Sequence, residues 1–295
     1  MSAVVGVGQA HIDHLAVVDR YPEVEANLEL AGLSLQGGGI VATALATLAN
    51  FGVPTRIVAK ISNDDFGRFI ERGLAALEMD TSHLVVEPDC ISPYRFVVIE
   101  RERHRHTVLH TPGSVSPLRP SEIDFSVLDD ASLLLIDGCH TDAQARLAEE
   151  ARKRDILVVL DAGALHEGMG DLVPLADVLV AAERYASEIA PRGEIEDSLI
   201  ELGRMGPKTV VVTLGEEGSI GLEGDKLVRQ PPLAVDVVDT TGAGEIFLGG
   251  YCYALLQKWP LERCMQVASA AAGLSCRELG ARAGMPRLQE VLESA

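Results

Sequence analysis

The chain has 295 residues, of which 47% are hydrophobic and only 4% aromatic, so it can bury a large core of aliphatic side chains. Its formal net charge of −19 argues against nucleic acid as a main partner, because nucleic-acid binding relies on basic side chains that neutralise phosphates. The cysteines are scattered, no apolar run has membrane-spanning length, and no basic signal-peptide region is present. We therefore expect a cytoplasmic protein with reduced thiols that does not bind a membrane.

Apolar runs typical of buried strands alternate with helical patterns along the chain. In chain order, the predicted strands are residues 3–7, 55–60, 133–136, 156–160, 178–181 and 209–214. The predicted helices are residues 38–50, 65–77, 142–154, 244–256 and 261–275. Strands that are apolar throughout are typical of a parallel sheet covered by helices on both faces. The sequence therefore predicts an α/β fold with a doubly wound, mainly parallel central sheet, in a single domain spanning residues 1–295.

Two pairs of short strands interrupt this rhythm. Residues 218–222 and 226–230 are predicted to form a late hairpin, and residues 94–99 and 107–110 an earlier one. We expect the earlier hairpin to belong to a small β lid formed by segments near 12–36 and 90–112. His104, His106 and His110 lie in this hairpin among arginines, and neighbouring cations disfavour metal binding, so a solvated turn is the favoured interpretation.

The most informative run, Asp-Thr-Thr-Gly-Ala-Gly-Glu, occupies residues 239–245. The β-branched residues before it, Val235, Val237 and Val238, predict a strand, and a helical stretch follows it. A strand, a small-residue turn and a helix N-terminus together direct unpaired N–H groups and the positive end of the helix dipole at an anion. Gly242 and Gly244 allow the backbone to approach a phosphate closely. Glu245, in the first helical turn, is a candidate general base for a hydroxyl that attacks phosphorus.

The other polar residues that follow predicted strands are expected to meet this run. In a doubly wound sheet, ligands bind beyond the carboxyl ends of the strands, where Asp13, Asp161 and Gly215 are predicted to lie. Residues 6–11 lack the third glycine of a dinucleotide-binding fingerprint, and the chain contains no P-loop motif. Three glycines at 37–39 before a helix also favour close approach of a ligand.

These motifs resemble those of the ribokinase-like (PfkB) carbohydrate kinase family, over essentially the whole chain. The family's C-terminal signature, D-T-x-G-A-G-D, is similar to residues 239–245, and its N-terminal signature is similar to residues 38–52. Further matches are Gly8 and Asp13 for an early G-x-x-x-x-D, residues 63–67, and Thr213 with Gly215 for a T-x-G turn. Within the family, residues 37–43 and 276–286 look most like the sulfofructose kinase branch.

The resemblance implies that the protein uses ATP and Mg²⁺ to phosphorylate a hydroxyl of a sugar or sugar-like small molecule. It implies that Gly242, Ala243 and Gly244 hold the transferring phosphoryl group and that Glu245 is the base. The sugar-binding residues implied are Asp13, Gly38, Gly39 and Thr43, and the nucleotide-binding residues are Thr213, Gly215, Gly218 and Gly280. Asp239 and Thr241 would contribute to a monovalent-cation site for K⁺, and Glu183 would be associated with Mg²⁺. A homodimer joined through the lid is also implied.

The chain departs from the family pattern at several positions. Glu245 stands where the base is normally Asp, and the extra methylene moves the carboxylate by about 1.5 Å, the length of one C–C bond. Thr43 replaces a sugar-contacting Asn, and the Mg²⁺-associated N-x-x-E motif falls on Ala182 and Tyr185. Cys139 stands where the sulfofructose kinase branch has Arg. The alternative is therefore a sugar- or nucleotide-binding protein of kinase fold that has lost efficient transfer.

Overall fold

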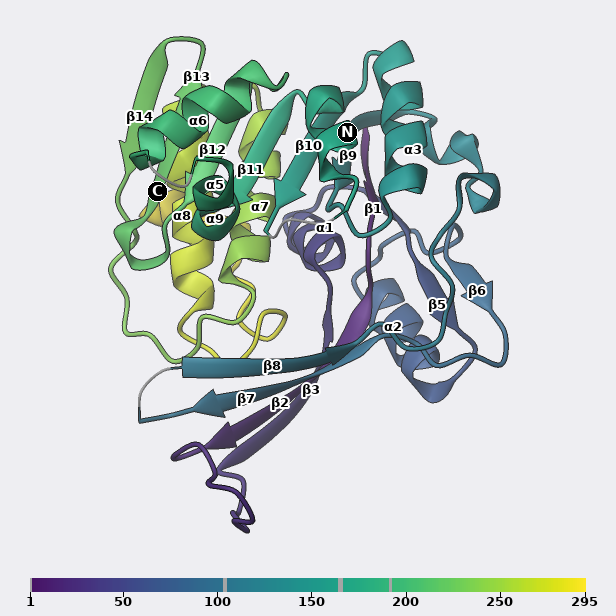
Figure 1. Ribbon diagram of the computed structural model, residues 1–295, viewed down its shortest axis with the longest axis vertical. Helices are drawn as coiled ribbons and strands as arrows, with labels where there is room; N and C mark the ends of the chain where they lie inside the picture. Colours follow the sequence, from purple (N-terminus) through teal and green to yellow (C-terminus); the bar gives the residue numbers. More distant parts are fainter. Residues whose placement is uncertain (1, 103–104, 164–166, 191–192) are drawn as a thin grey trace.

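The computed structural model describes residues 2–102, 105–163, 167–190 and 193–295, and its largest feature is a central eight-stranded sheet (Figure 1). Its strand order is β14-β13-β12-β11-β10-β9-β1-β4. The bounds are β1 Ala3–Val7, β4 Thr55–Val58, β9 Ala131–Ile136, β10 Leu157–Ala162, β11 Val178–Ala182, β12 Thr209–Thr213, β13 Ser219–Glu223 and β14 Lys226–Gln230. The neighbours from β4 to β12 pair in parallel, whereas β13 and β14 are antiparallel. The predicted α/β fold with a mainly parallel sheet is confirmed.

Helices cover both faces of this sheet (Figure 1). One face carries α1 (Ile40–Asn50), α2 (Asp65–Ala75), α7 (Ala243–Leu256), α8 (Leu261–Ser275) and α9 (Leu288–Ser294). The other face carries α3 (Thr141–Lys153), α4 (Met169–Leu172), α5 (Glu183–Ile189) and α6 (Ile195–Arg204). Successive side chains of a strand point to opposite faces, so Leu134 and Leu135 of β9 enter different cores. This is why the strands read as apolar throughout.

A second sheet lies below the main body in the view of Figure 1. Its strand order is β3-β2-β7-β8. The bounds are β2 His11–Val18, β3 Gly32–Gly38, β7 Tyr94–Glu100 and β8 Arg105–Thr111. Leu15, Val17, Val97 and Ile99 form a small buried core on one of its faces. The predicted hairpin is therefore two strands of a larger sheet, and His104 lies outside the described residues.

The strand predicted at residues 235–238 is wrong. This segment is irregular, and Val237 and Val238 are exposed. Val238 N donates a hydrogen bond to Cys276 O (2.8 Å), in the turn that follows α8. β-Branched residues favour a strand locally, but a strand also needs a neighbouring strand to pair with, and this segment pairs with none of the described strands.

Short elements complete the described chain. Two strands, β5 (Lys60–Ser62) and β6 (Val85–Glu87), form a small parallel sheet. The 3₁₀ turns are η1 (Pro120–Glu122), η2 (Phe125–Leu128), η3 (Val173–Leu175) and η4 (Gly215–Glu217). Among the described residues, no helix combines the length and the apolar character needed to cross a bilayer.

Candidate active site

A tight turn at residues 239–242 leads directly into α7. The buried Asp239 carboxylate holds it, because Oδ1 accepts hydrogen bonds from Thr241 N (3.1 Å) and Thr241 Oγ1 (2.8 Å). Its Oδ2 accepts a hydrogen bond from Gly280 N (2.9 Å), which ties the turn to the segment after α8. Gly242 follows with a φ of 80°, a conformation that favours glycine. The first N–H groups of a helix have no partner within it, so the start of α7 offers donors to an anion.

A polar cavity of about 240 Å³ lies between this turn, the start of α1 and the second sheet. The residues that line it are His11, Asp13, Gly38, Gly39, Thr43, Arg95, Val97, His106, Val108, Thr240, Thr241, Gly242, Gly244, Glu245 and Ala281. The four predicted sugar-binding residues are therefore brought together with Gly242, Gly244 and Glu245 in one cavity. Asp13 was expected to follow the first strand, but it lies within β2.

Two buried polar side chains require a glycine at position 38, just before α1. His11 and Asp13 point to the same face of β2, and His11 Nε2 lies 3.1 Å from Asp13 Oδ1. A Cβ atom on Gly38 would lie 2.3 Å from Asp13 Oδ2 and 2.5 Å from His11 Nε2. Burial lowers the pKa of His11, although the Asp13 carboxylate opposes that shift. His11 was not predicted as a site residue. Its position two residues before Asp13 could have indicated that it belongs to the site.

Glu245 lies where the polar cavity meets a smaller cavity of about 190 Å³ that also contains Asp161. Burial raises the pKa of Glu245, against the opposing effects of its own backbone hydrogen bond and of the positive charge of Arg95. Burial, together with the negative charges of Glu245 and Asp137, raises the pKa of Asp161 well above its usual range. Asp161 Oδ1 accepts a hydrogen bond from Gly163 N (3.0 Å). Two neighbouring acidic side chains whose pKa values are both raised, lining one cavity, are typical of a functional site.

The second sheet contributes two basic side chains that the sequence did not assign to the site. Arg95 of β7 and His106 of β8 both line the polar cavity. His106 was expected to belong to a solvated turn. Its side chain is exposed, as expected, but it lies within strand β8 rather than in a turn and lines the cavity. Among the described residues, no group of three or more His, Cys, Asp or Glu side chains could hold a metal ion.

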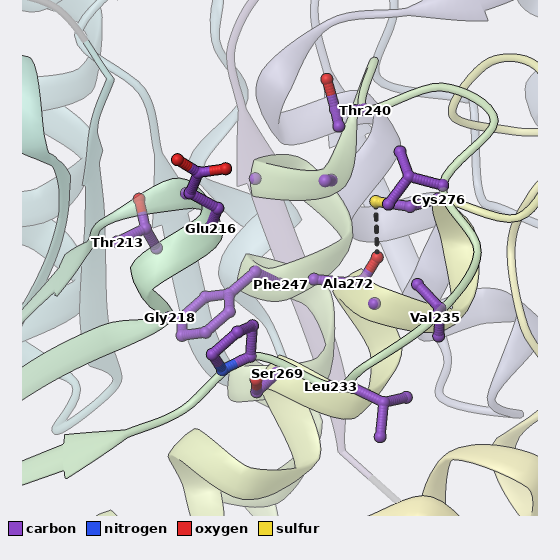
Figure 2. Close-up of a pocket in the computed structure, with 16 residues that line it drawn as sticks. Thr213, Glu216, Gly218, Leu233, Val235, Thr240, Phe247, Ser269, Ala272 and Cys276 are labelled. Carbon is purple, nitrogen blue, oxygen red and sulfur yellow. Dashed lines mark hydrogen bonds between the residues drawn. The ribbon is translucent and has the colours of Figure 1, made fainter. Parts of the chain in front are cut away.

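An apolar cavity of about 570 Å³ lies on the opposite side of the start of α7. Figure 2 shows Thr213 and Glu216 on one side of it and Leu233, Val235 and Cys276 on the other. Three of the predicted nucleotide-binding residues, Thr213, Gly215 and Gly218, line this cavity together with Ala243 and Gly244. Gly244 thus lines the apolar cavity, the polar cavity and the Asp161 cavity.

Two predicted site residues lie elsewhere. Gly280 lines none of the three cavities, and its N–H group instead holds the Asp239 carboxylate. Glu183 is exposed in the first turn of α5 and also lines none of them, whereas its neighbour Ala182 lines the Asp161 cavity. Sequence reasoning placed Asp161 at the end of a strand but gave it no role.

A sequence model of the pfkB family carbohydrate kinases matches residues 1–288. The ATP-dependent ribose-1-phosphate kinase of Halopiger xanaduensis is 25% identical, and the alignment covers 96% of this chain and 94% of that protein. The ribokinase of Arabidopsis thaliana, solved in complex with ribose and ATP, is 23% identical with a TM-score of 0.86, and the match covers 99% of this chain and 98% of that one. An E. coli protein solved with ATP and Mg²⁺ is 20% identical with a TM-score of 0.88, over 99% and 98% of the two chains.

Proposed function

Because this chain belongs to the pfkB family of carbohydrate kinases, which transfer phosphate to a sugar hydroxyl, we propose that Glu245 is the base of an ATP-dependent sugar phosphorylation at the start of α7. The observation that carries the proposal is the position of Gly244 and Glu245. Gly244 lines both the polar and the apolar cavity, and Glu245 lines the polar cavity beside it. A donor in one cavity and an acceptor in the other would meet at the N-terminus of a single helix, so the whole chain would work as one kinase domain.

The two cavities suit the two substrates. The apolar cavity, with Phe247, Val235 and Leu233, provides the apolar surface that an adenine base needs. The polar cavity provides the Asp13 carboxylate and the Thr43 hydroxyl for the hydroxyl groups of a sugar. A relative solved with ribose and ATP supports this pair of ligands.

Glu245 would accept the proton of the attacking hydroxyl while the α7 N-terminus stabilises the phosphoryl group. Glu245 is partly buried in the first turn of α7, and this position places its carboxylate in the wall of the polar cavity. Glutamate and aspartate have similar intrinsic pKa values, so the longer side chain changes the position of the base rather than its chemistry. The alternative, a binding protein with impaired transfer, predicts that Glu245→Asp greatly raises turnover, whereas our proposal predicts that it lowers turnover.

Sugar-dependent ADP release tests this function directly. We expect a coupled assay with Mg-ATP across ketoses, aldoses and nucleosides to find at least one acceptor. Binding of a sugar without turnover of any sugar in the panel would support the alternative instead.

The residues of the Asp161 cavity fit a Mg²⁺ site of the kind that nucleotide enzymes use. Mg²⁺ commonly binds through one or two carboxylates together with substrate phosphates and water, so a complete protein cage is not needed. The Asp161 carboxylate lies in a small cavity beside Gly244, and a nearby cation would offset the repulsion between Asp161 and Glu245. When bound, the ion would neutralise charge on the transferring phosphoryl group. Asp161 is therefore a better candidate than the exposed Glu183.

Replacing Asp161 by asparagine should lower kcat by about 10- to 100-fold and raise the Mg²⁺ concentration needed for half-maximal rate. The melting temperature should not fall, because the change removes a buried charge that is close to Glu245. Asp171→Asn, an equivalent change at an exposed position on α4, is the control. Unchanged Mg²⁺ dependence in Asp161→Asn would contradict this role.

Two finer expectations stay predictions. K⁺ binding near Asp239 and Thr241 would involve backbone carbonyl groups, because both Asp239 oxygens already accept hydrogen bonds from the protein. A preference for sulfofructose-like acceptors rests only on the sequence resemblance, and the relatives found include ribokinases and a nucleoside kinase.

We propose that the second sheet is a lid over the polar cavity and that its outer face joins two protomers. The strand register places Leu35, His14, Phe96 and Leu109 in one row across β3, β2, β7 and β8. Leu109 is 58% exposed and Leu33, on the same face, is 70% exposed. Contiguous exposed apolar side chains of this kind mark interaction surfaces on soluble proteins.

Leu109→Glu should convert a dimer into a monomer, because it places a charge in the apolar row. Sedimentation velocity at several concentrations measures the outcome. Leu227→Lys, an equally drastic change at an exposed position on β14, should leave the oligomeric state unchanged. A wild-type protein that sediments only as a monomer would contradict the proposed interface.

A further inference from the structure

One face of the second sheet presents a row of polar side chains toward the polar cavity. Register pairs Gln36 with Asp13, Asp13 with Arg95, and Arg95 with His110, so these four residues lie side by side across β3, β2, β7 and β8. Residues in register on neighbouring strands point to the same face of a sheet. Arg95 is the member of this row that brings a permanent positive charge to the cavity wall.

Arg95 lines the polar cavity together with Glu245, where burial raises the pKa of that carboxyl group and the positive charge of Arg95 lowers it. The Arg95 side chain is partly buried, yet it makes no hydrogen bond and no ion pair with any other described residue. A guanidinium carries five N–H donors and no acceptor, and withdrawing it from water without a partner is unfavourable. An unpaired arginine in a cavity wall is therefore best explained by a ligand that supplies the acceptors.

The carboxylate of the row, Asp13, lies close to two other basic side chains. Asp13 Oδ1 lies 3.1 Å from His11 Nε2. Arg282 lies behind Gly37, where a Cβ atom would come within 2.0 Å of Arg282 Nη1, and its charge interacts with that of Asp13. Asp13 thus lies among several basic side chains, and its ion-pair contact is with His11 and not with Arg95.

We propose that the acceptor is a sugar that carries an anionic group, a phosphate, carboxylate or sulfonate, bound by the Arg95 guanidinium with His106 on the same cavity wall. The proposal rests on the proposed kinase function and names the substrate class of its polar cavity. Arginine binds such groups through two parallel hydrogen bonds, which the hydroxyl groups of a neutral sugar cannot match. Val97 and Val108 separate Arg95 from His106 on this wall and would pack against the carbon chain. The anionic group would lie against the second sheet, and the hydroxyl to be phosphorylated would face Glu245.

The test compares matched ligands in two measurements. Equilibrium dissociation constants are measured calorimetrically with a non-hydrolysable ATP analogue and Mg²⁺, and kcat/KM is measured with ATP. The ligand sets are neutral hexoses and pentoses, their phosphate esters, the corresponding sugar acids, and a sugar sulfonate. We expect at least one anionic set to bind about 10- to 100-fold more tightly than the neutral sugars, the range expected for hydrogen bonds to a charged group. The set that binds most tightly identifies the anionic group as a phosphate, a carboxylate or a sulfonate.

Arg95→Met should weaken binding of the anionic sugars much more than binding of the neutral sugars or of the nucleotide, so that this preference is lost. Arg101→Met, which removes the same charge from an exposed position just after β7, is the matched control and should retain the preference. Melting temperatures confirm that both variants fold. Equal binding of neutral and anionic sugars, failure of every anionic sugar to bind, or an Arg95→Met effect of the same size on both classes would overturn the proposal. Arg95-dependent binding without turnover would retain this inference while contradicting the kinase function.

Discussion

Glu245→Gln should reduce kcat by about 10²- to 10⁴-fold, the contribution typical of a general base, with little change in sugar or ATP binding. Glutamine preserves the size and most hydrogen bonds of the side chain but cannot accept a proton. The change also removes a partly buried charge near Asp161, so the melting temperature should stay the same or rise. Single-turnover kinetics with saturating ATP separate the chemical step from binding.

The control for this variant is Glu216→Gln. Glu216 lines the apolar cavity, at a distance from the polar one, and its replacement should affect ATP binding at most modestly. A Glu245→Gln enzyme that keeps more than a tenth of the wild-type kcat would show that another group accepts the proton.

The pH dependence of the wild-type rate follows from the same residue. Because burial raises the pKa of Glu245, the carboxylate is protonated at a higher pH than an exposed glutamate would be. The base works only when ionised, so kcat/KM should fall as the pH drops through this raised pKa and reach its plateau above it. The acidic limb should be absent from the residual activity of Glu245→Gln.

Gly242→Ala should destabilise the protein and strongly reduce its activity. Gly242 has a φ of 80°, and a Cβ atom there would lie 2.0 Å from the Cβ atom of Ala281. The left-handed conformation costs about 1–2 kcal/mol for a residue with a side chain, and relieving the clash adds a similar amount. A shift of about 1 Å in this turn would move the α7 N–H groups away from the phosphoryl position, which can reduce the rate by about 100-fold.

Gly203→Ala is the matched control for this variant. Gly203 lies within α6, and apart from its own stretch of helix none of the described residues comes within 4 Å of the position of its Cβ. Replacing a helical glycine by alanine at an open position should stabilise the protein by about 0.5–1 kcal/mol and leave turnover unchanged. Urea unfolding measures both variants. If Gly242→Ala unfolds at the wild-type urea concentration with full activity, the turn does not need the geometry described here.

The central sheet could be predicted from the sequence because its signals are local. Short apolar runs such as residues 133–136 are typical of a strand buried on both faces, and Gly242 marks the turn that precedes α7. The same local reasoning failed at residues 235–238, because strand formation depends on a partner strand and not only on β-branched residues.

The cationic wall of the polar cavity could not be predicted, because it depends on long-range register. Arg95 reaches the cavity only because β7 pairs with β2 in one register, since a shift by one residue would turn Arg95 to the outer face. His106 reaches the polar cavity because β8 pairs with β7. This pairing extends closer to the hairpin turn than the strand predicted at residues 107–110. The role of Gly280 was also hidden, because its contact with Asp239 joins residues 41 positions apart.

Product identification tests the account most directly. The wild-type protein is incubated with Mg-ATP and each sugar of the neutral and anionic sets, and phosphorylated products are measured by ³¹P NMR and mass spectrometry. Our account predicts a new sugar phosphate ester, formed in equal amount with ADP, which Glu245→Gln fails to produce at a comparable rate. Sugar binding without any phosphorylated sugar, or equal product formation by Glu245→Gln, would contradict the account.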